Sequence, residues 1–102
     1  MSELYHNQKN LMRAAEDGDY EKALDCITKG VSPNCKDGNG WSVLHIASSN
    51  GNENVVKLLL DQGAIVNDTN YFGNTVLHLA ARYGHENIVK LLLDKVANID
   101  DK

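Results

Sequence analysis

The sequence has few of the residues that would point to particular classes of protein. It contains two cysteines, Cys26 and Cys35, too few for a disulfide framework or for a zinc site built from cysteine pairs. No apolar run exceeds three residues, as in Leu58-Leu59-Leu60, so no membrane span is expected. The first residues lack a basic start followed by an apolar run, which predicts no signal peptide. A reducing cytoplasmic or nuclear location is therefore predicted.

Arginine and net positive charge are also scarce. Arg13 and Arg82 are the only arginines, and 10 Lys+Arg stand against 14 Asp+Glu, giving a formal net charge of -4. Nucleic acid and acidic membranes are therefore disfavoured as partners, and a protein with a basic surface fits better. The 42% hydrophobic and 24% charged residues are ordinary for a folded domain and unlike a disordered chain.

Motifs for catalysis or metal binding are missing. The sequence has no Cys-x-x-Cys, no His-Glu-x-x-His and no glycine-rich phosphate loop. We expect no catalytic residues, no metal and no cofactor, and predict that the chain is not an enzyme. Acidic residues gather around one predicted turn without the spacing of a calcium loop, which favours a solvated face. They are Glu16, Asp17, Asp19, Glu21 and Asp25.

What the sequence does have is internal repetition. Residues 40–66 align without a gap with residues 73–99, at an offset of 33, and 15 of 27 aligned positions are identical. An upstream copy follows the same offset, so that Leu11, Ala14 and Gly18 correspond to Leu44, Ala47 and Gly51. A recurring unit of this length indicates a repeat array whose neighbouring units bury a shared core.

Each unit has the pattern of two short helices. Ser42 and Thr75 are good N-caps before an apolar-periodic stretch. Gly51 and Gly84 are predicted to end the first helix in the left-handed conformation, and Gly63 to end a second, leucine-rich helix. The polar, glycine-containing segments between units suit hairpin turns.

Two recurring motifs resemble those of the ankyrin repeat family. Ser42–Ala47 and Thr75–Ala80 are similar to its Thr-Pro-Leu-His-x-Ala motif, and Gly84–Leu93 is similar to its second-helix motif. The resemblance implies an all-α solenoid of about three helix-turn-helix repeats with short β-hairpin turns, forming one domain over residues 1–102. The expected repeats are about 4–36, which is cap-like, about 37–69 and about 70–102.

Some positions depart from the family pattern. Val43 and Val76 replace the proline that is pre-set for helix entry, which removes some rigidity. Val96 replaces the glycine seen at Gly63, and a β-branched residue in a left-handed site costs roughly 1–2 kcal/mol. The last helix is therefore expected to fray or to end differently near Val96.

The third repeat is expected to be internal in character. Ile88, Val89 and Leu92 are predicted to face a following repeat that this sequence does not contain. Either a longer array or self-association through the C-terminal repeat edge would cover them, since terminal repeats normally carry a polar outer face.

Several side chains are assigned structural roles. The resemblance implies that His45 and His78 hydrogen-bond the backbone of a neighbouring turn, which we favour over metal binding. Cys26 aligns with core leucines and is predicted to be buried, whereas Cys35 lies in a turn. Tyr20 is predicted to be packed between helices.

The aromatic residues and the family's contact positions indicate a partner-binding surface. Exposed aromatics on turns favour binding, although Trp41 and Phe72 could instead pack between adjacent hairpins. The contact positions implied by the resemblance are Glu16, Asp17, Asn39, Trp41, Ser49, Asn50, Tyr71, Phe72, Asn74, Arg82 and Tyr83. The predicted function is a scaffold or regulatory module that grips another protein on its hairpins and concave inner helices. The alternative is a targeting module of a larger enzyme whose catalytic domain lies outside this chain.

Overall fold

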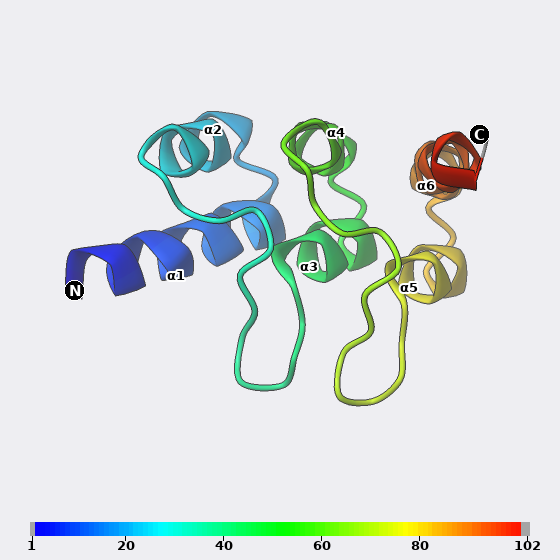
Figure 1. Ribbon diagram of the computed structural model, residues 1–102, viewed down its shortest axis with the longest axis horizontal. Helices are drawn as coiled ribbons and strands as arrows, with labels where there is room; N and C mark the ends of the chain where they lie inside the picture. The colour runs from blue at the N-terminus through cyan, green and yellow to red at the C-terminus, as the bar shows by residue number, and fades with distance from the viewer. Residues whose placement is uncertain (1, 101–102) are drawn as a thin grey trace.

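The computed structural model describes residues 2–100, and the surroundings of the side chains of residues 6–96. Within these residues the chain forms six helices, which pair in order into three layers (Figure 1). They are α1 (Ser2–Asp17), α2 (Tyr20–Thr28), α3 (Val43–Ser49), α4 (Glu53–Asp61), α5 (Val76–Arg82) and α6 (Glu86–Asp100). The layers stack into an elongated body with extents of 38 × 28 × 23 Å.

The helices form two rows. In Figure 1, α1, α3 and α5 make an inner row, α2, α4 and α6 make an outer row, and two long loops project from the inner row. Each loop closes with one antiparallel bridge, Lys36 to Ser42 in the first and Thr69 to Thr75 in the second. The predicted all-α solenoid with short hairpin turns is confirmed.

Side-chain caps start the inner helices where the sequence predicts them. Ser42 Oγ accepts a hydrogen bond from the backbone N–H of His45, and Thr75 Oγ1 accepts one from that of His78, both at 3.1 Å. Each imidazole Nδ1 in return accepts from the backbone N–H of its cap residue, at 3.3 Å. Both members of the capping box are thus present in two layers, which satisfies donors that a helix start leaves unpaired.

Left-handed glycines end the helices as predicted. Gly51 and Gly84 both have φ of 76°, and Gly63, after α4, has φ of 92°. Val96 occupies the position of Gly63 in the third layer, and there α6 continues helically to Asp100. The expectation that the last helix ends differently is confirmed, because valine disfavours the left-handed turn that glycine makes.

The core lies between successive layers. Leu11 and Leu44 occupy equivalent buried places, as the repeat alignment requires, and Leu59 and Leu92 are fully buried in the outer row. Leu77 has only a half-buried side chain, because no layer follows it among the described residues. The prediction that Cys26 is a small core residue is confirmed, with 3% of it exposed.

Two predictions about burial are wrong. Ile88 and Leu92 do not await a following layer, since they are only 2% and 0% exposed and pack inward. Among the apolar side chains of α6, Val89 is half-buried and Leu93 is 49% exposed. Tyr20 is 39% exposed rather than packed, because it stands at the start of α2 beside an open groove toward α4.

Replacing Gly51 with alanine is expected to destabilise the fold more than the same change at Gly84. Both residues have φ of 76°, so both changes carry the left-handed strain of about 1–2 kcal/mol. A Cβ on Gly51 would also lie 2.7 Å from the His85 ring, whereas one on Gly84 would meet nothing within 4 Å. Urea unfolding of both variants checks the difference, and equal losses in the free energy of unfolding would contradict the proposed interlayer contact.

Candidate partner-binding surface

An open groove of about 440 Å³ lies where the first hairpin meets the inner helices α1 and α3. Four of the predicted contact residues line it together, namely Glu16, Trp41, Ser49 and Asn50. Five lining residues were missed by the sequence reasoning: Lys9, Met12, Arg13, Asp37 and Ile46. The sequence does contain a signal for some of them, because Lys9, Arg13 and Glu16 are spaced so that they lie on one face of a helix. We call these nine residues the inner groove.

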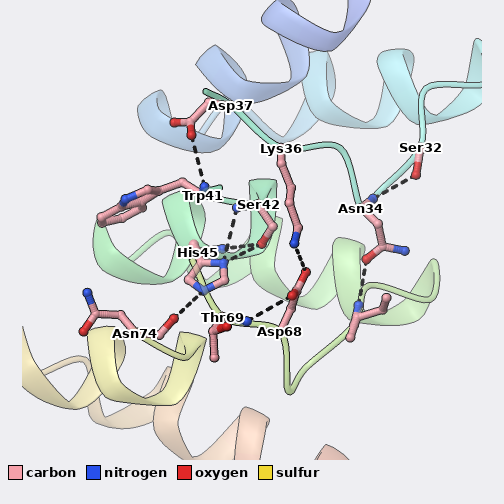
Figure 2. Close-up of polar contacts among 11 residues, drawn as sticks. Ser32, Asn34, Lys36, Asp37, Trp41, Ser42, His45, Asp68, Thr69 and Asn74 are labelled. Carbon is pink, nitrogen blue, oxygen red and sulfur yellow. Dashed lines mark hydrogen bonds and ion pairs between the residues drawn. The ribbon is translucent and has the colours of Figure 1, made fainter. Parts of the chain in front are cut away.

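The hairpin backbone at Trp41, one of the apolar residues of the inner groove, is held by Asp37. The carboxylate of Asp37 accepts hydrogen bonds from the backbone N–H groups of Asn39 and Trp41, at 2.9 and 3.0 Å. Figure 2 shows Asp37 pointing at the backbone of Trp41, whose ring lies 6.1 Å from the ring of His45. The Trp41 side chain is half-buried, and it lines the groove beside His45 of α3.

His45 joins the second layer to the third. Its Nε2 lies 3.0 Å from the carbonyl oxygen of Asn74, on the next hairpin (Figure 2). Burial lowers the pKa of His45 below its ordinary value. The predicted role of this histidine is confirmed. The same prediction is wrong for His78, which is exposed and, among the described residues, bonds only its own helix cap, because no layer follows it there.

The second hairpin presents two large aromatic side chains. Tyr71 and Phe72 are 75% and 69% exposed. Tyr71 also contacts the first hairpin, because its backbone N–H donates to the carbonyl of Asn39 at 3.1 Å and its ring passes close over Gly40. Tyr71 therefore packs partly against the neighbouring hairpin, whereas Phe72 does not pack between the hairpins.

Polar side chains link the inner-helix ends from one layer to the next. Asn52 Nδ2 donates to the carbonyl oxygens of Ala15 and Glu16, at 2.6 and 3.1 Å. His85 Nε2 lies 3.0 Å from the carbonyl oxygen of Ser49 in the equivalent place. These contacts fix the spacing of the helix ends that carry the predicted contact residues.

The hairpins are also joined by charge and by an asparagine. Lys36 Nζ lies 2.8 Å from Asp68 Oδ2, across the two loops. Asn34 Oδ1 accepts a hydrogen bond of 2.8 Å from the backbone N–H of Ile65. Figure 2 shows Lys36 and Asp68 next to the His45 contact and Asn34 farther along, so the two hairpins are held together at several points.

The predicted contact residues line one surface without all meeting in one groove. Arg82 Nη2 approaches Asn74 Oδ1 at 3.5 Å, and the Tyr83 ring, 54% exposed, lies 6.5 Å from the ring of His85. Exposed members are Glu16, Asp17, Asn39, Asn50, Tyr71, Phe72, Arg82 and Tyr83, and half-buried members are Trp41, Ser49 and Asn74.

Candidate metal ligands in the described chain are its His, Cys, Asp and Glu side chains. No three His, Cys, Asp or Glu side chains among the described residues gather closely enough to hold a metal ion. Cys35 is half-buried, and burial raises the pKa of its thiol to about 11. The thiol therefore stays protonated at neutral pH, and only the thiolate is a strong nucleophile. In the described part of the chain no helix is both long and apolar enough to cross a bilayer.

Three stacked helix pairs linked by hairpins define a helical repeat protein. A family model of three-copy ankyrin repeats matches residues 11–102. The chain belongs to the ankyrin repeat family. Members of this family are generally protein–protein interaction modules without catalytic activity of their own.

Curated relatives share this repeat region. The chain is 36% identical over 58 residues to ankyrin repeat-containing protein P1E11.10 of Schizosaccharomyces pombe, covering 57% of this chain and 28% of that protein. It is 36% identical over 64 residues to serine/threonine-protein kinase 12 of Arabidopsis thaliana, covering 63% and 14%. It is 39% identical over 59 residues to human ankyrin repeat and SAM domain-containing protein 3, covering 57% and 9%. The matched region thus spans less than a third of each of these relatives.

Proposed function

We propose that this chain is a protein-interaction module that holds its partner in the inner groove and along the neighbouring hairpin tips. The observation that supports the proposal is the half-buried side chain of Trp41, whose backbone N–H is held by Asp37, at a groove whose other apolar members are Met12 and Ile46. A half-buried aromatic side chain beside apolar surface offers a partner a large contact, and the part already packed has less freedom to lose on binding. The rigid interlayer contacts favour binding with little change of shape.

Negative charge near the inner groove supports a partner with a basic surface. Glu16 and Asp17 are exposed at the end of α1, next to the groove, and the whole chain has a formal net charge of -4. A protein with a basic surface would approach this end of the groove favourably, and nucleic acid would not. The two free cysteines, Cys26 and Cys35, support a location in the reducing cytoplasm or nucleus.

A second candidate is a targeting or substrate-recognition module of a larger enzyme. One similar protein, serine/threonine-protein kinase 12 of Arabidopsis thaliana, is named as an enzyme, and this chain matches 14% of it. In this case too, the repeats themselves would bind and would not catalyse. Sequencing the transcript that encodes this chain distinguishes the candidates, because a catalytic domain on the same polypeptide favours the second.

Replacing Trp41 with alanine is expected to weaken partner binding by more than about 1 kcal/mol, as expected for an aromatic anchor at an interface. Tyr83→Ala tests the far end of the surface, and Tyr20→Ala is the matched control, because Tyr20 is an exposed aromatic on the outer row. The partner is first identified by affinity capture with the wild-type chain, and its affinity for each variant is then measured by calorimetry. Wild-type affinity in folded Trp41→Ala protein would overturn the assignment of the groove.

A further inference from the structure

The inner groove lies at the place where a hairpin of the first layer would stand. In Figure 1 one loop lies below α3 and the next lies below α5, side by side, whereas among the described residues no loop lies below α1. Residues 4–8 stand at the repeat positions of the hairpin residues 37–41, and they form part of α1. The helical course of these residues therefore leaves the outer side of the first hairpin open.

The surface that the groove leaves open is covered one layer further on. Met12 and Asp37 line the groove and are half-buried, whereas their repeat counterparts His45 and Asn70 are 0% and 3% exposed. The first hairpin lies beside both counterparts, because its Trp41 ring is 6.1 Å from the ring of His45 and its backbone bonds to the second hairpin. The second layer thus shows which kind of element fits this surface, namely a loop.

The first hairpin also has an unpaired backbone donor. In the second hairpin the N–H of Tyr71 donates to the carbonyl oxygen of Asn39, at 3.1 Å, and so joins the two loops. Gly38 stands at the repeat position of Tyr71, and its N–H donates no hydrogen bond within the described part of the chain. A backbone N–H is a strong donor, so the open side of the hairpin offers a bond to the carbonyl oxygen of an incoming loop.

The α1 wall of the groove has charges that the α3 wall lacks. Lys9, Arg13 and Glu16 are exposed on α1, and their repeat counterparts on α3 carry no charge. Arg13 makes no hydrogen bond or ion pair with any described residue, and the Asp37 carboxylate already accepts two backbone N–H groups of its own hairpin. A guanidinium pairs most strongly with a carboxylate. An occupant that complements this wall therefore carries an acidic side chain for Arg13.

We propose that the partner inserts a loop into the inner groove, in the way that the first hairpin fits the second layer. A backbone carbonyl of this loop accepts a hydrogen bond from the Gly38 N–H, and a large apolar side chain lies against Trp41 and Met12. An acidic side chain of the loop pairs with Arg13, and the basic surface of the partner lies against Glu16 at the end of α1. This inference rests on the proposed function and names the part of the partner that the groove holds.

Disulfide-closed random peptides, with as many residues as segment 35–43 and displayed on phage, supply the probe. They are selected on the complete 102-residue chain. Enriched sequences are expected to combine a large apolar residue with Asp or Glu. The most enriched peptide is then synthesised with a fluorescent label, and its Kd for each variant of the chain is measured by fluorescence polarisation.

Two substitutions at Gly38 isolate the backbone hydrogen bond. The φ of Gly38 is not positive, and a Cβ there would meet nothing within 4 Å, so alanine and proline both fit the turn. Gly38→Ala keeps the N–H and Gly38→Pro removes it. The peptide is expected to bind Gly38→Pro about fivefold more weakly than Gly38→Ala.

A charge reversal tests the acidic side chain of the loop. Arg13→Glu is expected to weaken peptide binding more than about tenfold, because it replaces an ion pair with like-charge repulsion. Lys90→Glu is the matched control, since Lys90 is an exposed cation on α6, outside the groove, and less than about a twofold change is expected there. Circular dichroism checks that every variant is folded.

Three outcomes would overturn the loop inference. These are equal affinities of Gly38→Pro and Gly38→Ala, equal affinities of Arg13→Glu and Lys90→Glu, and the enrichment of no peptide. Trp41→Ala separates this inference from the proposed function. If Trp41→Ala loses the peptide while the Gly38 and Arg13 variants keep it, the groove binds and the loop inference alone is wrong. If folded Trp41→Ala binds the peptide as the wild type does, the groove assignment fails as well.

Discussion

Replacing Leu59 with alanine is expected to lower the free energy of unfolding by about 3 kcal/mol. Leu59 is fully buried in α4, and α4 packs against α2 on one side and α6 on the other. Truncation therefore leaves a cavity shared by three layers, and the loss combines the transfer free energy of the removed atoms with the cost of that cavity. A domain of this size has only about 5–15 kcal/mol of stability, so the loss is a large fraction of the total.

Leu93→Ala is the matched control for this change. It is the same truncation in the following outer helix, but its side chain is 49% exposed, so the expected loss is below about 1 kcal/mol. Chemical denaturation followed by circular dichroism, at a protein concentration where the chain is monomeric, measures both variants. Equal losses would contradict a core located between layers, because burial is the main difference between the two leucines.

Much of the fold could be predicted because the residues that begin and end each helix act on backbone groups close to them in the sequence. Ser42 and Thr75 cap inner helices and Gly51 and Gly63 end helices, because hydroxyl caps and left-handed glycines act through their own backbone. These contacts are local in sequence, so a single sequence is enough to locate them. The fixed offset then places equivalent residues in successive layers.

Burial near the ends of the stack was harder to predict, because it depends on which neighbour is present. His78 and Leu77 have the same sequence context as their buried counterparts, yet they are exposed and half-buried in the last layer. The Tyr20 prediction had an available correction, since Tyr20 aligns with Glu53 and Glu86 and neither of these is buried.

The candidate site was predicted only in part, because the family's contact positions cover some of its residues and not others. Trp41, Ser49 and Asn50 were located through the family's contact positions, and the structure brings them together. Lys9 and Arg13 were not, because α1 is 16 residues long where the other inner helices have 7, and the family pattern does not cover its early turns. Which of the contact positions bind a partner depends on that partner's shape, which the sequence does not encode.

Replacing His45 with alanine is expected to lower the free energy of unfolding by about 2–3 kcal/mol at neutral pH. The buried imidazole joins the α3 cap to the next hairpin, since Nδ1 accepts from the Ser42 N–H at 3.3 Å while Nε2 lies 3.0 Å from the Asn74 carbonyl. Its removal leaves both backbone groups without these partners and opens a small cavity. His78→Ala is the matched control, because it removes the same cap contact at an exposed site with no interlayer bond, and its expected loss is below about 1 kcal/mol.

The pH dependence of stability separates the role of His45 from simple loss of packing. Its two contacts need a neutral ring with the proton on Nε2, because a proton on Nδ1 would face the Ser42 N–H. Burial holds the folded pKa below the ordinary 6.5, so the unfolded chain binds a proton near pH 6.5 while the folded chain does not. Stability from this residue is therefore complete above pH 6.5 and falls as the pH drops toward the folded pKa, with a slope of up to about 1.4 kcal/mol per pH unit. Denaturation between pH 7 and pH 5 should show this slope in wild-type and His78→Ala proteins and a shallower one in His45→Ala; an unchanged slope in His45→Ala would mean that another group is responsible.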